Sequence, residues 1–132
     1  KDALFSEVAE NGMRRLIAGL ERFKASGDKD WLLDFIRYYL SAEHVANVGG
    51  GCGLPTLSAD VTRIDQDTKA VYRARLLEAA AVISDDKGKQ ASALLLLSSL
   101  MGAVIISRAT GDGNLRQELM DALCLQVKSA QT

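Results

Sequence analysis

The stretch from Ala91 to Ser107 contains seventeen residues without one charged side chain. A helix that is apolar nearly all round must be covered on more than one side. The stretch includes four serines and is shorter than the roughly twenty predominantly apolar residues that cross a bilayer. We therefore expect a covered helix from Lys89 to about Ala109, in a chain that does not enter a membrane.

A chain of 132 residues builds one domain, and a domain of that size has little interior to surround such a helix. One side of the predicted helix carries bulky residues such as Leu97 and Val104. Another side is a stripe of small residues where a second helix could approach closely: Ser92, Ser99, Ala103 and Ser107. The pattern predicts that part of this helix faces a second copy of the chain, so we expect a homodimer.

The rest of the chain also favours helices. It contains one proline, where average usage of roughly 5% would give six or seven. Apolar residues spaced three and four apart predict five further helices, over residues 2–26, 30–41, 54–64, from Asp65 or Asp67 to Ile83, and 114–127. Residues 41–53 do not follow this helical spacing. Asp28 or Asp30 could cap the second of these, and Asn114 with Gln117 could cap the last. The prediction is an all-α bundle of about six helices in a single domain, residues 1–132.

Composition and motifs exclude several function classes. A net charge of −1 and a pI near 5.8 give no basis for sequence-independent binding to the phosphates of DNA. Two cysteines are too few for a disulfide scaffold or a structural zinc site, which favours a reducing, cytoplasmic compartment. No cluster of residues has metal-ligand spacing, so neither a metal nor another cofactor is expected. No nucleophile elbow, Ser-His-Asp order or pair of carboxylates in apolar surroundings occurs, and we expect no enzyme activity.

Several short motifs occur in the order found in TetR-family transcriptional regulators. The opening Lys1-Asp2-Ala3-Leu4-Phe5 resembles the point where the chain of those regulators leaves the DNA-binding head. Tyr39-Leu40-Ser41 with Glu43-His44 and Gly50-Gly51-Cys52, then Leu57-Ser58-Ala59-Asp60-Val61, resemble segments that follow in the family. Gly102-Ala103-Val104 through Ser107-Arg108-Ala109, with Asp112 and Leu115, resembles the pattern of its dimerisation helices.

The resemblance implies the C-terminal effector-binding and dimerisation domain of a bacterial one-component repressor. Residues 1–27 would be the connecting helix from a helix-turn-helix head that this chain does not include, and operator DNA would be bound only through that head. The last two helices would pair with their copies as a four-helix interface. The residues expected in this interface are Ser92, Ser99, Ala103, Ser107, Leu115, Leu119 and Leu123.

An effector pocket for a small, mostly apolar molecule follows from the same resemblance and from the helix faces. Five of the seven aromatic residues lie between Phe23 and Tyr39, a concentration typical of a core and equally compatible with a cavity lining. The expected lining residues are Met13, Ile17, Trp31, Phe35, Tyr38, Tyr39, His44, Leu57, Tyr72 and Met101. His44 is the only histidine, and it is either a satisfied loop or core group or a hydrogen-bond partner of the effector.

Cys52 offers an alternative trigger. It follows three glycines and precedes a predicted helix start, where backbone N–H groups stabilise a thiolate. Two interpretations follow: Cys52 is a redox or electrophile sensor, or it is a small buried side chain. Cys124, on the flank of the last helix, is interpreted as interface packing. A third possibility is a stand-alone helical interaction module without any DNA-binding head.

Overall fold

The computed structural model describes residues 2–47 and 66–130, and in these ranges it contains helices and turns but no strand. The elements are α1 (Asp2–Ala25), α2 (Trp31–Tyr39), α3 (Ala42–Ala46), α5 (Gln66–Ile83), the 3-10 turn η1 (Lys87–Lys89), α6 (Gln90–Thr110) and α7 (Gly113–Ala130). The predicted all-α character is confirmed for this part of the chain. The short helix predicted over residues 54–64 lies outside the described residues.

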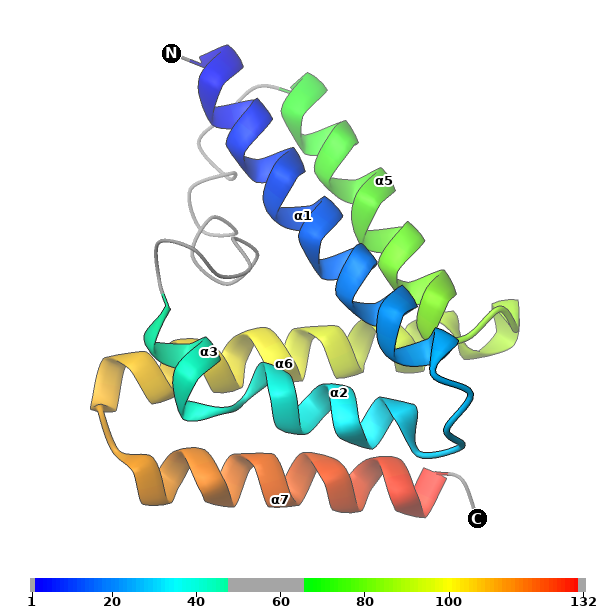
Figure 1. Ribbon diagram of the computed structural model, residues 1–132. Coiled ribbons are helices and arrows are strands. Elements are labelled where there is room, and N and C mark those ends of the chain that lie inside the picture. The colour runs from blue at the N-terminus through cyan, green and yellow to red at the C-terminus, as the bar shows by residue number, and fades with distance from the viewer. Residues whose placement is uncertain (1, 48–65, 131–132) are drawn as a thin grey trace.

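The helices form two groups that cross each other (Figure 1). In one group α1 and α5 lie side by side along most of their length. In the other group, α6 and α7 are antiparallel neighbours, and α2 packs against α7. Contacts between α1 and α2 and between α5 and α6 join the two groups.

One apolar core lies between the groups. Its fully buried members come from both of them, and they include Leu20 on α1, Ile36 on α2, Ala79 on α5 and Val104 on α6, each with at most 1% of its surface exposed. On α1 the buried side chains Met13, Leu16, Ile17 and Leu20 recur at three- and four-residue steps, as the sequence pattern predicts. The helical period of the sequence therefore identifies the inward face of α1.

Two helix starts differ from the sequence-based predictions. The helix α3 begins inside the stretch expected to be irregular, because the Ser41 hydroxyl oxygen accepts a hydrogen bond from the His44 amide at 3.2 Å and caps it. The last helix begins at Gly113 and is capped by Asp112, whose Oδ1 accepts from the amides of Asn114 at 2.9 Å and Leu115 at 3.1 Å. The predicted cap by Asn114 is therefore wrong, since a residue nearer the turn already holds those amides.

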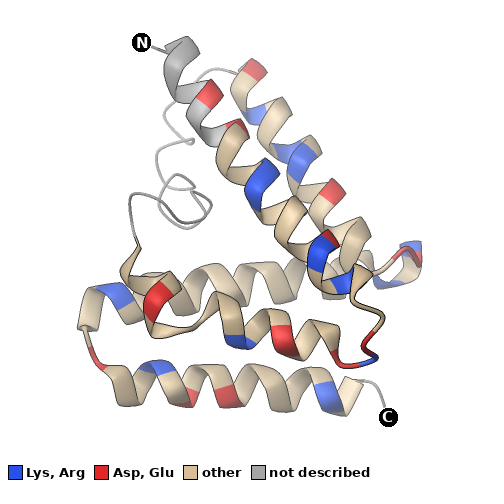
Figure 2. Ribbon diagram, in the orientation of Figure 1, with Lys and Arg blue, Asp and Glu red and all other residues tan. Residues whose placement is uncertain are grey.

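The helix α6 contains the uncharged stretch, and Figure 2 shows it without charged residues until its last turn. Its buried residues include Ala93, Leu97 and Leu100, which face the rest of the chain. By length and composition alone the segment Lys87–Thr110 could cross a membrane, a property that core helices of soluble proteins share. In the structure α6 contacts α5, α7 and α3, while Leu95, Ile105 and Ile106 on it remain exposed.

Candidate functional site

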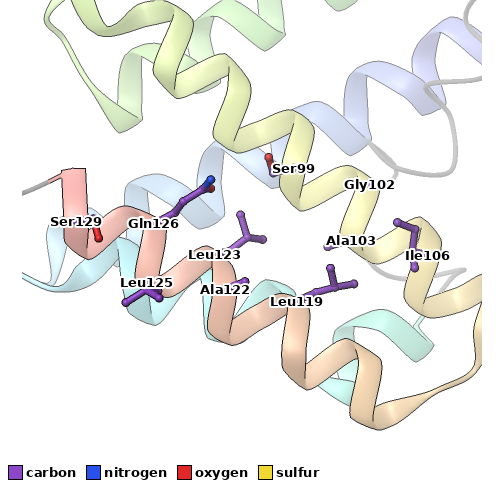
Figure 3. A pocket seen from close by; sticks show the side chains of 10 residues that line it. All are labelled: Ser99, Gly102, Ala103, Ile106, Leu119, Ala122, Leu123, Leu125, Gln126 and Ser129. Atoms are coloured by element: carbon purple, nitrogen blue, oxygen red, sulfur yellow. The ribbon is translucent and has the colours of Figure 1, made fainter.

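A face of α6 that the described residues leave uncovered forms an apolar groove with α7 (Figure 3). The groove has a volume of about 680 Å³, and we call it the α6–α7 groove. Ile106 is 44% exposed and Leu125 is 66% exposed at this groove, so both present apolar surface to solvent. The lining residues are Ser99, Gly102, Ala103, Ile106, Leu119, Ala122, Leu123, Leu125, Gln126 and Ser129.

Residues seven positions apart lie along the same face of a helix, because seven residues make about two turns. Ser92, Ser99 and Ile106 are related in this way, and so are Leu95, which is 66% exposed, and Gly102. A Cβ atom built on Gly102 would meet no atom within 4 Å apart from the backbone of its own helix, so the described residues leave open space above this glycine.

The residues predicted for the dimer interface fall into three sets. Ser99, Ala103, Leu119 and Leu123 line the α6–α7 groove, although Ala103 and Leu123 are already buried within the chain at 4% and 6% exposure. Ser92 is exposed on the same face of α6, and Leu115 is half-buried near the start of α7. Ser107 follows Ile106 directly but does not line the groove, because its side chain is buried and lines a second hollow.

The residues predicted for the effector pocket form much of the core. Met13, Ile17, Phe35 and Tyr39 are buried in one cluster, and Trp31, Tyr72 and Met101 pack against it. Tyr38 is 43% exposed and differs in this from the others. None of the predicted pocket residues lines the α6–α7 groove or the second hollow, and Leu57 lies outside the described residues.

Aromatic rings fill the space between α1, α2 and α3. The ring of Phe35 lies 5.6 Å from those of Phe23 and Tyr39, measured between centroids. The His44 ring continues the series, 4.5 Å from Tyr39 and 5.4 Å from Tyr38. The aromatic concentration noted in the sequence is therefore a packed cluster that anchors α3 to α2.

His44 is 7% exposed, and burial lowers the pKa of its imidazole below the ordinary value near 6.5. A hydrogen bond with the Tyr39 backbone opposes this effect, and the positive charge of Arg108 adds to it. The Nδ1 atom of the ring is buried without a hydrogen-bond partner in the described structure. The lowered pKa favours the neutral form of the ring, which is held by packing and by the hydrogen bond with the Tyr39 backbone.

The structure describes only one of the two cysteines, Cys124. Cys52, the candidate sensor, lies outside the described residues. Cys124 is buried at 7% exposure in the core, and burial raises the pKa of its thiol. A buried thiol with a raised pKa is a poor nucleophile, so Cys124 acts as a packing residue.

The second hollow, of about 430 Å³, lies where α3 meets the turn between α6 and α7. Arg108 and Arg116 both line it, one from each side of that turn. The sequence analysis missed this pair, because the two arginines are on different helices and no local spacing connects them. The Gly111-Asp112-Gly113 turn between them was the available signal, since a turn of that kind brings its flanking helices side by side.

Within the described residues, no three His, Cys, Asp or Glu side chains are grouped so as to hold a metal ion. The exposed apolar groove and the arginine-lined hollow are two candidate sites among the described residues. Comparison of the chain with protein-family models, with curated proteins and with solved structures found no match.

Proposed function

We propose that this chain is the ligand-sensing and dimerisation domain of a TetR-type transcriptional regulator, a repressor that a small, mostly apolar effector releases from its operator. The observation that carries the proposal is the α6–α7 groove, an uncovered apolar face built by the last two helices. The order of the sequence motifs supports the same assignment. Operator binding would belong to a head outside this chain.

The α6–α7 groove is suited to pairing with the same groove on a second copy of the chain. Two-fold pairing places the same surface on both partners, so α6 and α7 would meet their copies as four helices. Burial of Ile106 and Leu125 would remove apolar surface from water, at roughly 25 cal/mol for each Å². The empty space above Gly102 would admit a side chain of the partner or a close approach of its backbone.

The connecting role of α1 supplies the mechanism. α1 packs along α5 and contacts α2. An effector that shifts either of these helices would therefore shift α1. Between the two long helices the Glu10 carboxylate lies 2.9 Å from the Arg75 guanidinium, which, with Arg14 at the same distance, lowers the pKa of Glu10. An effector that binds one packing arrangement of these helices more tightly than another would shift the population towards the first arrangement. The separation of the two DNA-binding heads of a dimer would change with it. Operator affinity would then fall by the factor by which the effector prefers one arrangement over the other.

The dimer is tested by the mass of the full chain at micromolar concentration, measured by light scattering after size exclusion. We expect a dimer, and we expect Ile106→Glu to give a monomer because it places a charge in the groove. Ile105→Glu is the matched control, since Ile105 is the neighbouring isoleucine, 48% exposed, and does not line the groove. A monomeric wild-type chain, or equal behaviour of the two variants, would exclude the proposed interface.

The DNA-binding part of the proposal is tested separately, by reading the codons upstream of Lys1. We expect them to encode a basic helix-turn-helix; without it the chain is a stand-alone interaction module. The covalent alternative is tested by titrating the Cys52 thiol. A pKa at or above about 8.5, the reference for a free thiol, would reject Cys52 as a sensor.

A further inference from the structure

The short helix α3 is held in place by side chains from elements distant in sequence. Nε of Arg108, near the end of α6, donates a hydrogen bond to the carbonyl of Val45 at 2.8 Å. Nη1 of Arg116, on α7, donates to the carbonyl of Leu40 at 2.9 Å, just before α3 begins. Two arginine side chains therefore hold the backbone on both sides of His44.

The ring of His44 packs on the aromatic side chains of α2. Only 7% of the residue is exposed, and the ring centroid lies 4.5 Å from that of Tyr39 and 5.4 Å from that of Tyr38. Its Nδ1 atom is buried and has no hydrogen-bond partner among the described residues. A protonated imidazole carries an N–H on both nitrogens, so protonation would leave a donor buried without an acceptor.

The cations around this ring oppose a positive charge on it. Burial lowers the pKa of His44, a hydrogen bond with the Tyr39 backbone acts in the opposite direction, and the positive charge of Arg108 on α6 lowers the pKa further. Arg116 adds a second cation from α7, close to the start of α3. A proton on His44 would therefore bring a third positive charge into this part of the fold.

The acidic groups of this region do not balance that charge. Glu43 on α3 is exposed, and Asp112 in the turn between α6 and α7 accepts hydrogen bonds from the first amides of α7. Within residues 2–47 and 66–130, no carboxylate is among the groups that shift the pKa of His44. A buried charge without a counter-ion is strongly disfavoured. Protonation of His44 and packing of α3 therefore oppose each other.

Opening of α3 would disturb little of the apolar core. The helix has five residues, and among the described members of the core cluster only Val45 lies in it. The helices α1, α2, α5, α6 and α7 supply buried side chains that pack without α3. A segment with few buried apolar contacts opens locally at a lower free energy than the whole domain unfolds. The opposition between charge and packing can therefore be relieved by α3 alone.

We propose that the packing of α3 against α2 and α6 is a pH-sensitive contact, which opens when His44 takes up a proton while the other described helices stay folded. In the open form the imidazole is in water and takes up a proton near pH 6.5. In the packed form it does so only at lower pH, so the packing is complete above about pH 6.5 and weakens as pH falls. The contact uses no residue of the α6–α7 groove, so the proposal is independent of the proposed dimer.

The test is amide exchange with solvent in the full chain, measured by NMR at about pH 7.5 and about pH 5.5 and divided by the intrinsic rate at each pH. The amides of Val45 and Asn47 report on α3, because they donate to carbonyls at its start and within it at 3.0 Å and 3.1 Å. The amide of Gly111, bonded to a carbonyl of α6 at 3.0 Å, reports on that helix. We expect protection at Val45 and Asn47 to fall about five- to tenfold, the factor for a group of ordinary pKa in the open form, and protection at Gly111 to stay constant.

His44→Gln removes the titrating group, so the protection of α3 should then be equal at both pH values. Glu43→Gln is the matched control, because Glu43 is the neighbouring, exposed residue of the same helix, and this variant should keep the pH dependence of the wild-type chain. If His44→Gln does not fold, His44→Phe replaces it, since phenylalanine keeps a ring against Tyr39. Unchanged protection of Val45 in the wild-type chain, an equal loss in the variants without His44, or a fall of the same size at Gly111 would overturn the proposal.

Discussion

The imidazole of His44 is kept neutral by its surroundings in the folded chain. The ring lies between the aromatic side chains of α2, and both burial and Arg108 disfavour its protonated form. The sequence left open whether this histidine faces an effector or the core. The structure places it in the core, because the Ser41 cap starts α3 and turns His44 inward.

The lowered pKa of His44 predicts that the chain loses stability as pH falls. The unfolded chain takes up a proton near pH 6.5 and the folded chain only at a lower pH. The stability that the neutral ring contributes is therefore complete above about pH 6.5 and is lost as pH falls towards the lowered pKa. We expect the urea midpoint to drop between about pH 7.5 and about pH 5.5, and to drop less in His44→Gln. The chain has no other histidine, so equal drops in both proteins would contradict this account.

Tyr38 and Phe35 show where side-chain periodicity stops being informative. Both lie on the face of α2 that the sequence pattern marks as apolar, yet Phe35 is 1% exposed and Tyr38 is 43% exposed. Both rings contact Phe23 on α1, at 5.6 Å for Phe35 and 5.5 Å for Tyr38 between centroids, but Phe35 belongs to the buried core cluster and Tyr38 does not. Which aromatic side chains are buried therefore depends on tertiary packing as well as on the helical period.

At the level of elements, the connection between α6 and α7 is a turn that constrains its residues closely. Gly111 has a φ of +61°, and its amide donates to the Ser107 carbonyl at 3.0 Å to end α6. Asp112 then caps α7. Glycine and aspartate in this turn predict the break between two helices, and the structure adds that α7 begins one residue earlier than expected.

Gly111→Ala is expected to lower the free energy of unfolding by about 1–2 kcal/mol, because alanine is disfavoured in the left-handed region. A Cβ at Gly111 would meet nothing within 4 Å, so the cost is one of backbone conformation. Gly102→Ala is the matched control: it lies inside α6, also has open space, and should raise stability by about 0.5–1 kcal/mol. Urea unfolding of both variants in the Ile106→Glu background measures these effects without association. A loss of stability in Gly102→Ala as large as in Gly111→Ala would contradict the argument.

For the whole molecule, the question is how a chain of this size covers an uncharged helix. The inner side of α6 packs on α5 and α7, and its outer side keeps Leu95 and Ile106 exposed. The sequence predicted both the covered helix and the need for a partner. The structure locates the uncovered side and shows that α7 completes the groove along it.

Association through this groove predicts that thermal stability depends on protein concentration. A partner that binds only the folded chain stabilises it by mass action. We expect the Tm of the wild-type chain to fall by about 5 °C over about a hundredfold dilution. The Tm of Ile106→Glu should stay constant over the same range. A constant Tm for both proteins would show that the groove is not covered by a second copy under these conditions.

The sequence by itself determined the helical class, the inward face of α1 and the approximate extent of α1, α2, α5, α6 and α7. These properties depend on local periodicity, on capping residues and on the scarcity of proline, all of which act within one element. The tertiary structure alone decided that Tyr38 is exposed, that Ser107 does not line the α6–α7 groove, and that Arg108 and Arg116 line one hollow. Those facts depend on how helices cross, and the crossing is set by packing between residues far apart in the chain.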